Sequence, residues 1–254
     1  MIDFAKDLAY KAGKIIRTNF SLGMKKQWKA DGTPLTLTDK IVNELVINKI
    51  TKKFPTHSIL GEEKKLMKKN SSFTWVCDPV DGTIPFSHGY PTFTFSLALV
   101  KDGKAILGVV YDVMLERLFW AERGGGAFLN DKRIFVNKHN SLDNQLINLD
   151  ADFSSFYGKF QEKVFKKNVF VSVLYSATYG GILVACGEYI AEAYGSNKPW
   201  DGAAISVIVE EAGGKVTDIY GNDQKYDREI NGFIASNGLV HKEIIEIIGE
   251  KNGK

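Results

Sequence analysis

The chain has 254 residues, of which 44% are hydrophobic and 25% are charged, as in ordinary soluble globular proteins. This composition excludes a disordered, collagen-like or coiled-coil chain, and the length predicts one large domain or two modest ones. Lysine and arginine (33) nearly balance aspartate and glutamate (30), so the formal charge of +3 gives no support for a nucleic acid polymer as a partner.

The sequence carries no feature of an exported or membrane-bound protein. Its two cysteines, Cys77 and Cys186, are too few for a disulfide scaffold and are typical of a reducing compartment. The first twenty residues are charged throughout, unlike a signal peptide, and no run reaches the roughly 18 apolar residues of a membrane-spanning helix. We therefore expect a cytoplasmic protein without membrane association.

The N-terminal part is predicted to contain two helices. Apolar residues at helical spacing indicate an amphipathic helix over residues 4–20, with Gly23 just beyond its end. Residues 29–34 (KADGTP) have turn chemistry. A second helix is expected to start near Thr38 or Asp39, either of which can cap it, and to be ended by the next proline.

The remaining pattern predicts strands first and then strands alternating with helices. Short strands are expected at 58–60 and 73–77, with the charged stretch 64–72 between them as a surface loop. An antiparallel meander follows, with strands at 93–100, 106–111, 117–121 and 127–129. The second half is expected to have strands at 169–174, 189–193, 215–219 and 232–235 and helices at 176–186, 201–212 and 241–248. The class is therefore mixed α and β in layers.

Acidic residues are concentrated in one short window. Glu62 and Glu63 stand in LGEE, and Asp78 and Asp81 in CDPVDGT. Two aspartates on either side of a proline turn can point into one pocket, where each would raise the pKa of the other unless a cation lay between them. Such ligands suit Mg²⁺, and paired metals about 4 Å apart support phosphoryl transfer to water. The alternative is that this motif is only a turn, and that a distant Asp201 is only a helix cap.

The chain resembles the inositol monophosphatase family of Mg²⁺-dependent, lithium-sensitive phosphatases over nearly its whole length. The motifs that carry the resemblance are LTLTD (35–39), GEE (61–63), DPVDGT (78–83), HGYPTF (88–93), GVVYD (108–112), PWDGAA (199–204) and EEAGG (210–214). It implies an α+β fold, a layered α-β-α-β-α sandwich. Residues 1–135 would form an α+β half with an antiparallel sheet and most metal ligands. Residues 136–254 would form an α/β half with the remaining ligand and substrate-facing segments, packed tightly against the first.

The resemblance implies two or three Mg²⁺ ions in one site. Glu62, Asp78 and the backbone carbonyl of Val80 would hold the first ion. Asp78, Asp81 and Asp201 would hold the second.

Catalytic roles are implied in the same way. Asp39 lies where the family supports a third, weaker metal, close to Glu62. Thr83 and Glu62 would orient and deprotonate the attacking water, and the amides of Gly82 and Thr83 would bind the phosphate. Glu63 would support the ligands without being one. Lys29 is a candidate contact for phosphate or water.

Substrate recognition is where the sequence departs from the family. Ile84 and Pro85 follow DPVDGT in place of a polar pair, and Tyr194 stands where inositol-specific members carry a substrate-binding glutamate. Tyr175 replaces a glycine of the usual Arg-x-x-Gly-Ser-Ala segment. The expected substrate contacts are Asp81, Gly82, Thr83, Ala177, Tyr194 and Asp201.

The resulting expectation is a phosphatase for a small sugar or polyol phosphate resembling inositol 1-phosphate. Histidinol phosphate, fructose 1,6-bisphosphate and 3′-phosphoadenosine 5′-phosphate are alternatives, since Tyr175 or Tyr194 could stack on an imidazole or adenine ring. Equally, either tyrosine could be a core residue. A non-enzymatic alternative is a regulatory relative that uses its metals only for structure. The basic stretch 64–69 could line the pocket entrance, and the resemblance suggests a homodimer.

Overall fold

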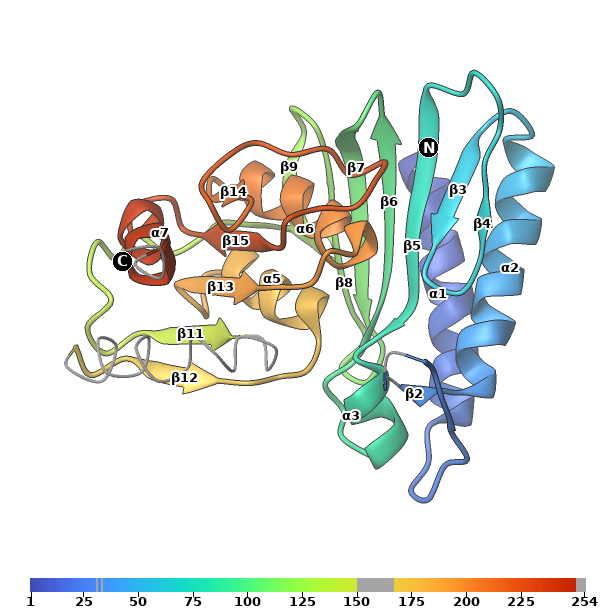
Figure 1. The fold of residues 1–254 in the computed structure, drawn as a ribbon, viewed down its shortest axis with the longest axis horizontal. Helices are drawn as coiled ribbons and strands as arrows, with labels where there is room; N and C mark the ends of the chain where they lie inside the picture. The colour runs from blue at the N-terminus through green and yellow to red at the C-terminus, as the bar shows by residue number, and fades with distance from the viewer. Residues whose placement is uncertain (31, 33, 150–166, 250–254) are drawn as a thin grey trace.

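The computed structural model describes residues 1–30, 32, 34–149 and 167–249. These residues form five layers (Figure 1). Helices α1 (Ile2–Asn19) and α2 (Leu37–Lys53) cover one face of the larger sheet. Helices α5 (Ala177–Ala185) and α6 (Pro199–Glu211) lie between this sheet and a smaller one, whose outer face is covered by α7 (His241–Gly249). The layered α-β-α-β-α sandwich expected from the sequence is confirmed.

The larger sheet has eight strands within the described residues. Their order is β10-β9-β8-β7-β6-β5-β3-β4, and every pair is antiparallel except β3 with β5. The strands are β3 (Ser58–Gly61), β4 (Lys65–Leu66), β5 (Phe73–Asp81), β6 (Thr94–Lys101), β7 (Lys104–Asp112), β8 (Arg117–Glu122), β9 (Gly126–Leu129) and β10 (Lys132–Ile134). The predicted meander is the β6–β9 part of this sheet.

The smaller sheet has five strands in the described part of the chain, in the order β12-β11-β13-β15-β14. Strand β11 is parallel to both of its neighbours, and the other pairs are antiparallel. The strands are β11 (Leu146–Leu149), β12 (Phe170–Ser172), β13 (Ala191–Tyr194), β14 (Lys215–Thr217) and β15 (Phe233–Ser236). A small hairpin, β1 (Gln27–Trp28) with β2 (Pro34–Leu35), and the short helix α3 (Thr83–His88) complete the described elements.

Three local predictions need correction. Helix α2 is capped by Thr36, and Asp39 is the third helical residue, whose side chain bonds back to the cap in a capping box. Helix α1 ends at Phe20 in an extended conformation, so Gly23, at φ +71°, belongs to the following turn. The stretch 64–72 is not wholly a loop, because β4 within it pairs with β3.

The middle layer approaches the larger sheet so closely that backbones touch. A Cβ atom on Gly108 in β7 would lie 2.6 Å from the carbonyl oxygen of Ala204 in α6. Only glycine fits at this crossing, because the Cβ atom of any other residue would overlap the backbone of α6. The contact holds the start of α6, and Asp201 on it, at a fixed position over the sheet.

A buried histidine ties α7 to the smaller sheet. The hydroxyl of Thr217 donates to the carbonyl of Asp218, so it accepts from Nε2 of His241 at 2.9 Å. Nδ1 of His241 then accepts from the Ser236 hydroxyl at 2.8 Å. This arrangement needs a neutral ring. Burial, with a smaller contribution from the charge of Lys215, lowers the pKa of His241 to about 4.

We expect His241 to make the fold sensitive to acid. Because its pKa falls from 6.5 when unfolded to about 4 when folded, its contribution to stability is complete above pH 6.5 and is lost as the pH falls towards 4. The check is the free energy of unfolding from urea titrations between pH 4 and 7.5. The variant His241→Gln should show a smaller loss over this window. Equal losses in both proteins would contradict the assignment.

Within the residues that the structure describes, no helix combines the length and the apolar character needed to cross a bilayer.

Candidate active site

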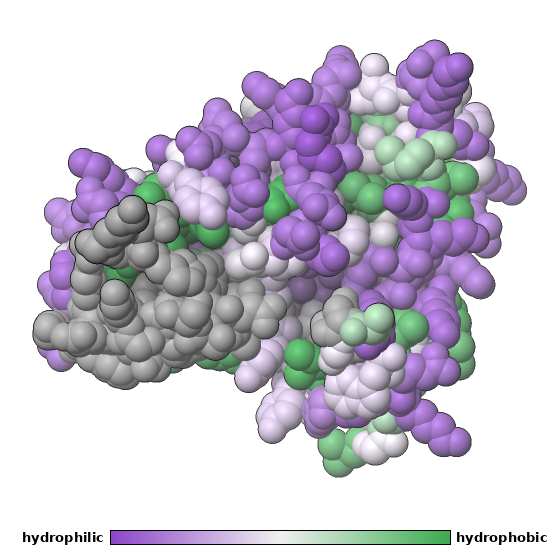
Figure 2. All heavy atoms as spheres, viewed as in Figure 1, coloured by the Kyte–Doolittle hydropathy of each residue, from purple (hydrophilic) through white to green (hydrophobic). Residues whose placement is uncertain are grey.

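A cavity of about 610 Å³ opens where the ends of β5, α5 and α6 meet. We call it the acidic cavity. It is lined by the turns 80–84 and 194–198, by Lys29 and Tyr175, and by four carboxylates, those of Glu62, Asp78, Asp81 and Asp201. The molecular face in Figure 2 is hollowed near its centre, where hydrophilic residues gather. The structure therefore brings the predicted ligands, which are spread over residues 62–201, to one place.

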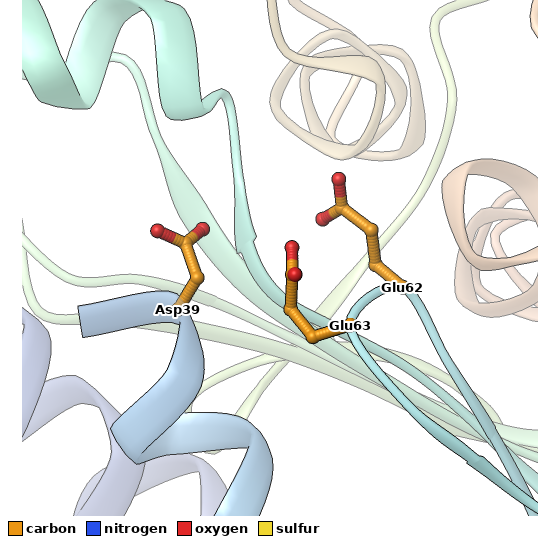
Figure 3. Close-up of side chains that lie close together, drawn as sticks. All are labelled: Asp39, Glu62 and Glu63. Atoms are coloured by element: carbon orange, nitrogen blue, oxygen red, sulfur yellow. The ribbon is translucent and has the colours of Figure 1, made fainter. Parts of the chain in front are cut away.

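One group of three carboxylates joins α2 to the end of β3. Asp39, Glu62 and Glu63 each place a carboxylate oxygen within 4.8 Å of the others. Figure 3 shows the three side chains turned towards one another, Asp39 from the first turn of α2 and the two glutamates from the segment after β3. The sequence analysis gave Glu63 a supporting role, and the structure places a carboxylate oxygen of Glu63 within 4.8 Å of those of Asp39 and Glu62.

The capping box of α2 fixes Asp39. Its Oδ2 accepts from the Thr36 amide at 2.8 Å and from the Thr36 hydroxyl, which leaves Oδ1 facing Thr83. The Thr83 hydroxyl lies 3.3 Å from Oδ1 of Asp39 and 3.0 Å from the carbonyl oxygen of Val80. With its proton directed to one of these acceptors, the hydroxyl oxygen of Thr83 keeps a lone pair for a molecule in the cavity.

Lys29 is the counter-ion of this group. Its Nζ atom donates to Glu62 and to Glu63, at 2.6 Å in each case, and the three side chains are at most 19% exposed. Burial opposes the charged form, yet the two carboxylates raise the pKa of Lys29 above its ordinary value. Burial also raises the pKa of Glu62, against the effect of Lys29. Lys29 therefore stays charged and occupies the position of a cation between two acids.

We expect Lys29→Met to destabilise the metal-free protein by about 2 kcal/mol, because two partly buried carboxylates would lose their shared donor. Added Mg²⁺ should reduce this difference, since a divalent cation restores positive charge beside Glu62 and Glu63. The measurement is the melting temperature of both proteins in EDTA and in Mg²⁺. A deficit that Mg²⁺ leaves unchanged would show that Lys29 acts only through packing.

The second group lies at the end of strand β5. Asp78, Asp81 and Asp201 are buried, and their carboxylates lie within 4.8 Å of one another. Asp78 and Asp81 are among the last four residues of strand β5, where the register with β6 shifts, and Asp201 lies in the first turn of α6. Pro79 and the irregular register let two aspartates of one strand face the same side.

This second group is electrostatically unfavourable as it stands. Burial raises the pKa of Asp78 well above its ordinary value, and Glu62, Asp81 and Asp201 raise it further. Burial also raises the pKa of Asp81, although hydrogen bonds to the carboxylate oppose this. Buried carboxylates that repel each other are stabilised by a cation between them, so this donor set fits a hard divalent ion.

Asp81 is held by the N-terminus of α5. Its Oδ2 accepts from the Thr178 amide at 2.9 Å, from the Thr178 hydroxyl at 2.7 Å, from the Thr94 hydroxyl at 3.4 Å, and from the Ser176 hydroxyl. Its Oδ1 accepts only from the Ala177 amide among the described residues, at 3.1 Å. The crowded Oδ2 therefore leaves Oδ1 as the oxygen with room for a metal.

These donors include three residues that the sequence analysis did not select, Thr94, Ser176 and Thr178. Ser176 had a detectable signal, because a serine at the start of the predicted helix 176–186 is a good capping residue, and in the structure it caps α5, its hydroxyl accepting from the Tyr179 amide. Thr94 and Thr178 are 84 residues apart in the chain, and their hydroxyls touch only in the fold. No local pattern marks such a contact.

The turn after Asp81 places Gly82 and Thr83 at the cavity wall. Gly82 has φ +87° and caps α3, and a Cβ atom there would lie 2.8 Å from the carbonyl oxygen of Thr92 and 3.0 Å from the Cβ of Ser176. The left-handed conformation and the lack of space both require glycine. Thr83 is the first residue of α3 and lies close to Asp39, as described above.

Two tyrosines also line the acidic cavity. Tyr175 is 48% exposed and adopts φ +54°, a strained conformation for a residue other than glycine. Tyr194 ends β13, lines the cavity and stacks on Phe233 with ring centroids 5.8 Å apart. Ala177, expected to contact substrate, gives its amide to Asp81 instead and is not among the residues that line the cavity.

A layered α-β-α-β-α sandwich in which six carboxylates gather around the end of strand β5 is the arrangement of a metal-dependent hydrolase of phosphate esters. The model of the inositol monophosphatase family matches residues 1–252, and the chain belongs to that family. Its members are phosphatases, hydrolases of phosphoric monoesters, and they depend on metals. The protein is therefore an enzyme of this class.

Proteins named for phosphatase activity on different substrates are similar to this chain. The fructose-1,6-bisphosphatase/inositol-1-monophosphatase of Thermotoga maritima is 34% identical over 98% of this chain and 96% of its own length. The histidinol-phosphatase of Chlorobaculum parvum is 32% identical over 98% and 96% of the two chains. Among solved structures, the IMPase of Thermotoga maritima superposes with a TM-score of 0.89 at 34% identity, covering 98% of this chain and 96% of its own. The suhB protein of Bartonella henselae has a TM-score of 0.90 at 27% identity, covering 99% and 98%.

Proposed function

We propose that this phosphatase is Mg²⁺-dependent and hydrolyses a small sugar or polyol phosphate, such as inositol 1-phosphate, by activating a water molecule. The observation that carries the proposal is that two carboxylate groups meet at one cavity, which is lined by Glu62 of the first group and by all three aspartates of the second. The first group is the one drawn in Figure 3. Carboxylate oxygens are the ligands that Mg²⁺ prefers, and it completes its shell with water and substrate phosphate oxygens. Buried acids with raised pKa values need such a cation.

In this proposal each ion takes ligands from more than one segment. Glu62, Asp78 and the Val80 carbonyl would hold the first ion, and Asp78, Asp81 and Asp201 the second. Asp39, close to Glu62 and Glu63, would support a third, weaker one. When bound, the metal ions lower the pKa of water and offset the negative charge that develops on the leaving oxygen.

The protein's own groups would orient the water and the phosphate. The Thr83 hydroxyl can direct its proton to Asp39 or Val80 and so accept a hydrogen bond from the attacking water. Glu62 would take the proton of that water once its ion pair with Lys29, which also binds Glu63, is weakened. The amides of Gly82 and Thr83, at the wall of the cavity, would bind phosphate oxygens.

The alcohol part of the substrate would lie on the side of Tyr175 and Tyr194. A second candidate class is an ester whose alcohol carries a planar heterocycle, and the half-exposed ring of Tyr175 favours it. Similar proteins offer precedents, since one relative is named a histidinol-phosphatase and one solved relative, 27% identical, is described as bound to 2'AMP.

A substrate panel tests the proposal. We expect Mg²⁺-dependent release of phosphate from inositol 1-phosphate with a higher kcat/KM than from histidinol phosphate or 3′-phosphoadenosine 5′-phosphate. A preference for either heterocyclic ester would replace the sugar or polyol assignment by the second candidate. Absence of phosphate release from every ester, with Mg²⁺ still bound, would favour the regulatory role over the catalytic one.

The proposal includes a cytoplasmic homodimer. Cys77 and Cys186 are free thiols, which supports a reducing compartment. Light scattering during gel filtration measures the mass directly, and a value near that of one 28.3 kDa chain would contradict the dimer.

A further inference from the structure

A row of three polar side chains crosses the smaller sheet where α5 covers it (Figure 1). Asn148 of β11 pairs in parallel register with Ser172 of β12 on one side and with Glu192 of β13 on the other. Residues paired in this way project from the same face of a sheet. Asn148 is 1% exposed and Glu192 is fully buried, so the centre of the row belongs to the interior of the protein.

The side-chain amide of Asn148 bonds to both neighbouring strands. Its Nδ2 donates to Oε1 of Glu192 at 2.6 Å. Its Oδ1 accepts from the Ser172 hydroxyl at 3.1 Å and from the backbone amide of Leu174 at 3.2 Å. One side chain therefore joins β13 to the segment that leaves β12.

Helix α5 leaves this row no room to move. A Cβ atom on Gly180 would overlap Oε1 of Glu192 and would lie 2.5 Å from Nδ2 of Asn148. The same helix donates the amides of its first residues to Asp81. The bonds of Asn148 are thus held between a sheet and a helix that are themselves fixed to the acidic cavity.

Both segments that Asn148 joins lead to a tyrosine of the acidic cavity. Tyr175 directly follows Leu174, and Tyr194 stands two residues after Glu192, on the same face of β13. Tyr175 has φ +54°, a conformation that persists in a tyrosine only where its surroundings impose it. The hydrogen bond to the preceding amide, that of Leu174, is one such constraint.

We propose that Asn148 is a positioning residue for the substrate. By tying β13 to the segment 172–174, it fixes the separation of the Tyr175 and Tyr194 rings and so the shape of the space for the alcohol part of the ester. The inference rests on the proposed function, because it takes the alcohol to lie beside these tyrosines. Asn148 is not among the residues that line the acidic cavity and acts through the two segments. An amide suits this role, because it donates at one end and accepts at the other.

The donor and the acceptor of this link can be exchanged between two residues. Asn148→Asp keeps an acceptor for Ser172 and Leu174 but sets a second carboxyl group against Glu192, which breaks the link to β13. In the double variant Asn148→Asp/Glu192→Gln, the introduced amide can donate to the introduced carboxylate, and the link returns in the opposite direction. Glu192→Gln alone is the reference, because Asn148 can still donate to its oxygen.

Two esters of different size measure the effect. Inositol 1-phosphate has a ring that can contact both tyrosines, whereas ethyl phosphate is too short to do so. In Asn148→Asp we expect KM for inositol 1-phosphate to rise by at least about tenfold, while its kcat and both constants for ethyl phosphate change by less than about threefold. The double variant should return this KM to within about threefold of that of Glu192→Gln. Equal changes for both esters, or no rescue by Glu192→Gln, would overturn the positioning role.

Ser172→Ala gives a milder test at a half-buried position. It removes one of the two bonds to Oδ1 of Asn148 and leaves the amide of Leu174 in place. We expect KM for inositol 1-phosphate to rise by about threefold, with no change for ethyl phosphate. An unchanged KM for inositol 1-phosphate would contradict the role, even if Asn148→Asp did not fold.

A measurement on the tyrosines themselves separates this inference from the proposed function. In protein labelled with fluorotyrosine, the fluorine resonances of Tyr175 and Tyr194 should shift in Asn148→Asp and return in the double variant. The resonance of Tyr10, on α1, should stay in place. If neither ester is hydrolysed in Mg²⁺, the proposed function fails, and these resonances then decide whether Asn148 positions the two rings. Unshifted resonances of Tyr175 and Tyr194 refute the inference, whether or not an ester is hydrolysed.

Discussion

Replacement of Asp78 by asparagine should lower kcat by at least about a thousandfold while raising the melting temperature of the metal-free protein. The loss of turnover follows because Asp78 lies between Glu62 and the other aspartates and is the proposed ligand of two ions, and weakened charge stabilisation of about 4 kcal/mol gives this factor. The gain in stability follows because burial and three neighbouring carboxylates disfavour its charge, which asparagine does not carry.

The two effects are measured separately, kcat in saturating Mg²⁺ and calorimetric melting in EDTA. Asp223→Asn is the matched control, since it removes the charge of an exposed aspartate remote from the acidic cavity and should change neither quantity appreciably. An active Asp78→Asn enzyme at ordinary Mg²⁺ concentrations would refute the proposed mechanism. A lower melting temperature in EDTA would instead show that the aspartate is stabilised by its surroundings without metal.

Thr178→Val should weaken Mg²⁺ binding by about ten- to a hundredfold, although Thr178 is not itself a proposed ligand. Its hydroxyl donates to Oδ2 of Asp81 at 2.7 Å and helps to turn Oδ1 towards the metals. Loss of this charge-assisted hydrogen bond in a buried position should also destabilise the fold by about 2 kcal/mol.

Calorimetric titration with Mg²⁺ or Mn²⁺ measures the affinity without reference to turnover. Thr178→Ser is the decisive companion, because it keeps the hydroxyl and removes only a methyl group. We expect it to regain most of the metal affinity. If serine and valine weaken binding equally, Thr178 acts by filling space and does not position Asp81.

Local sequence patterns were sufficient for most elements and for the main acidic motifs. Alternating apolar residues located β5 to β9, and the Asp-Pro-x-Asp-Gly turn predicted that Asp78 and Asp81 share a pocket, which the structure confirms. Short elements were missed, namely β1, β2, β4, β10 and β11, because two to four residues carry too little periodicity to separate a strand from a loop. Likewise, Thr38 and Thr36 are equally good caps by residue type, and only the bond from Asp39 back to Thr36 selects between them.

Contacts between distant segments explain what the sequence did not reveal at the site. Lys29 was a candidate contact for phosphate or water, which stays a prediction; the structure adds that it lines the acidic cavity and bridges Glu62 and Glu63 across more than thirty residues. The resemblance implied Glu62 and Asp78 as ligands of one ion, and this stays a prediction. The structure adds that Glu62 lies in a group with Asp39 and Glu63, and Asp78 in a group with Asp81 and Asp201. Which carboxylates meet depends on how α2, β3 and α6 pack, and no local motif encodes that packing.

The attachment of Asp81 to α5 has a consequence for how the chain reaches and keeps its native state. Asp81 ends strand β5 of the larger sheet, whereas its donors Ser176, Ala177 and Thr178 lie at the start of a helix of the middle layer, about a hundred residues later. The site is therefore assembled only after both parts of the chain have folded and met. Ions that bind there would stabilise that joined state by RT ln(1 + [L]/Kd). Cellular magnesium would then govern the lifetime and abundance of the folded enzyme as well as its rate. Depletion of magnesium would expose the chain to proteolysis even without a mutation.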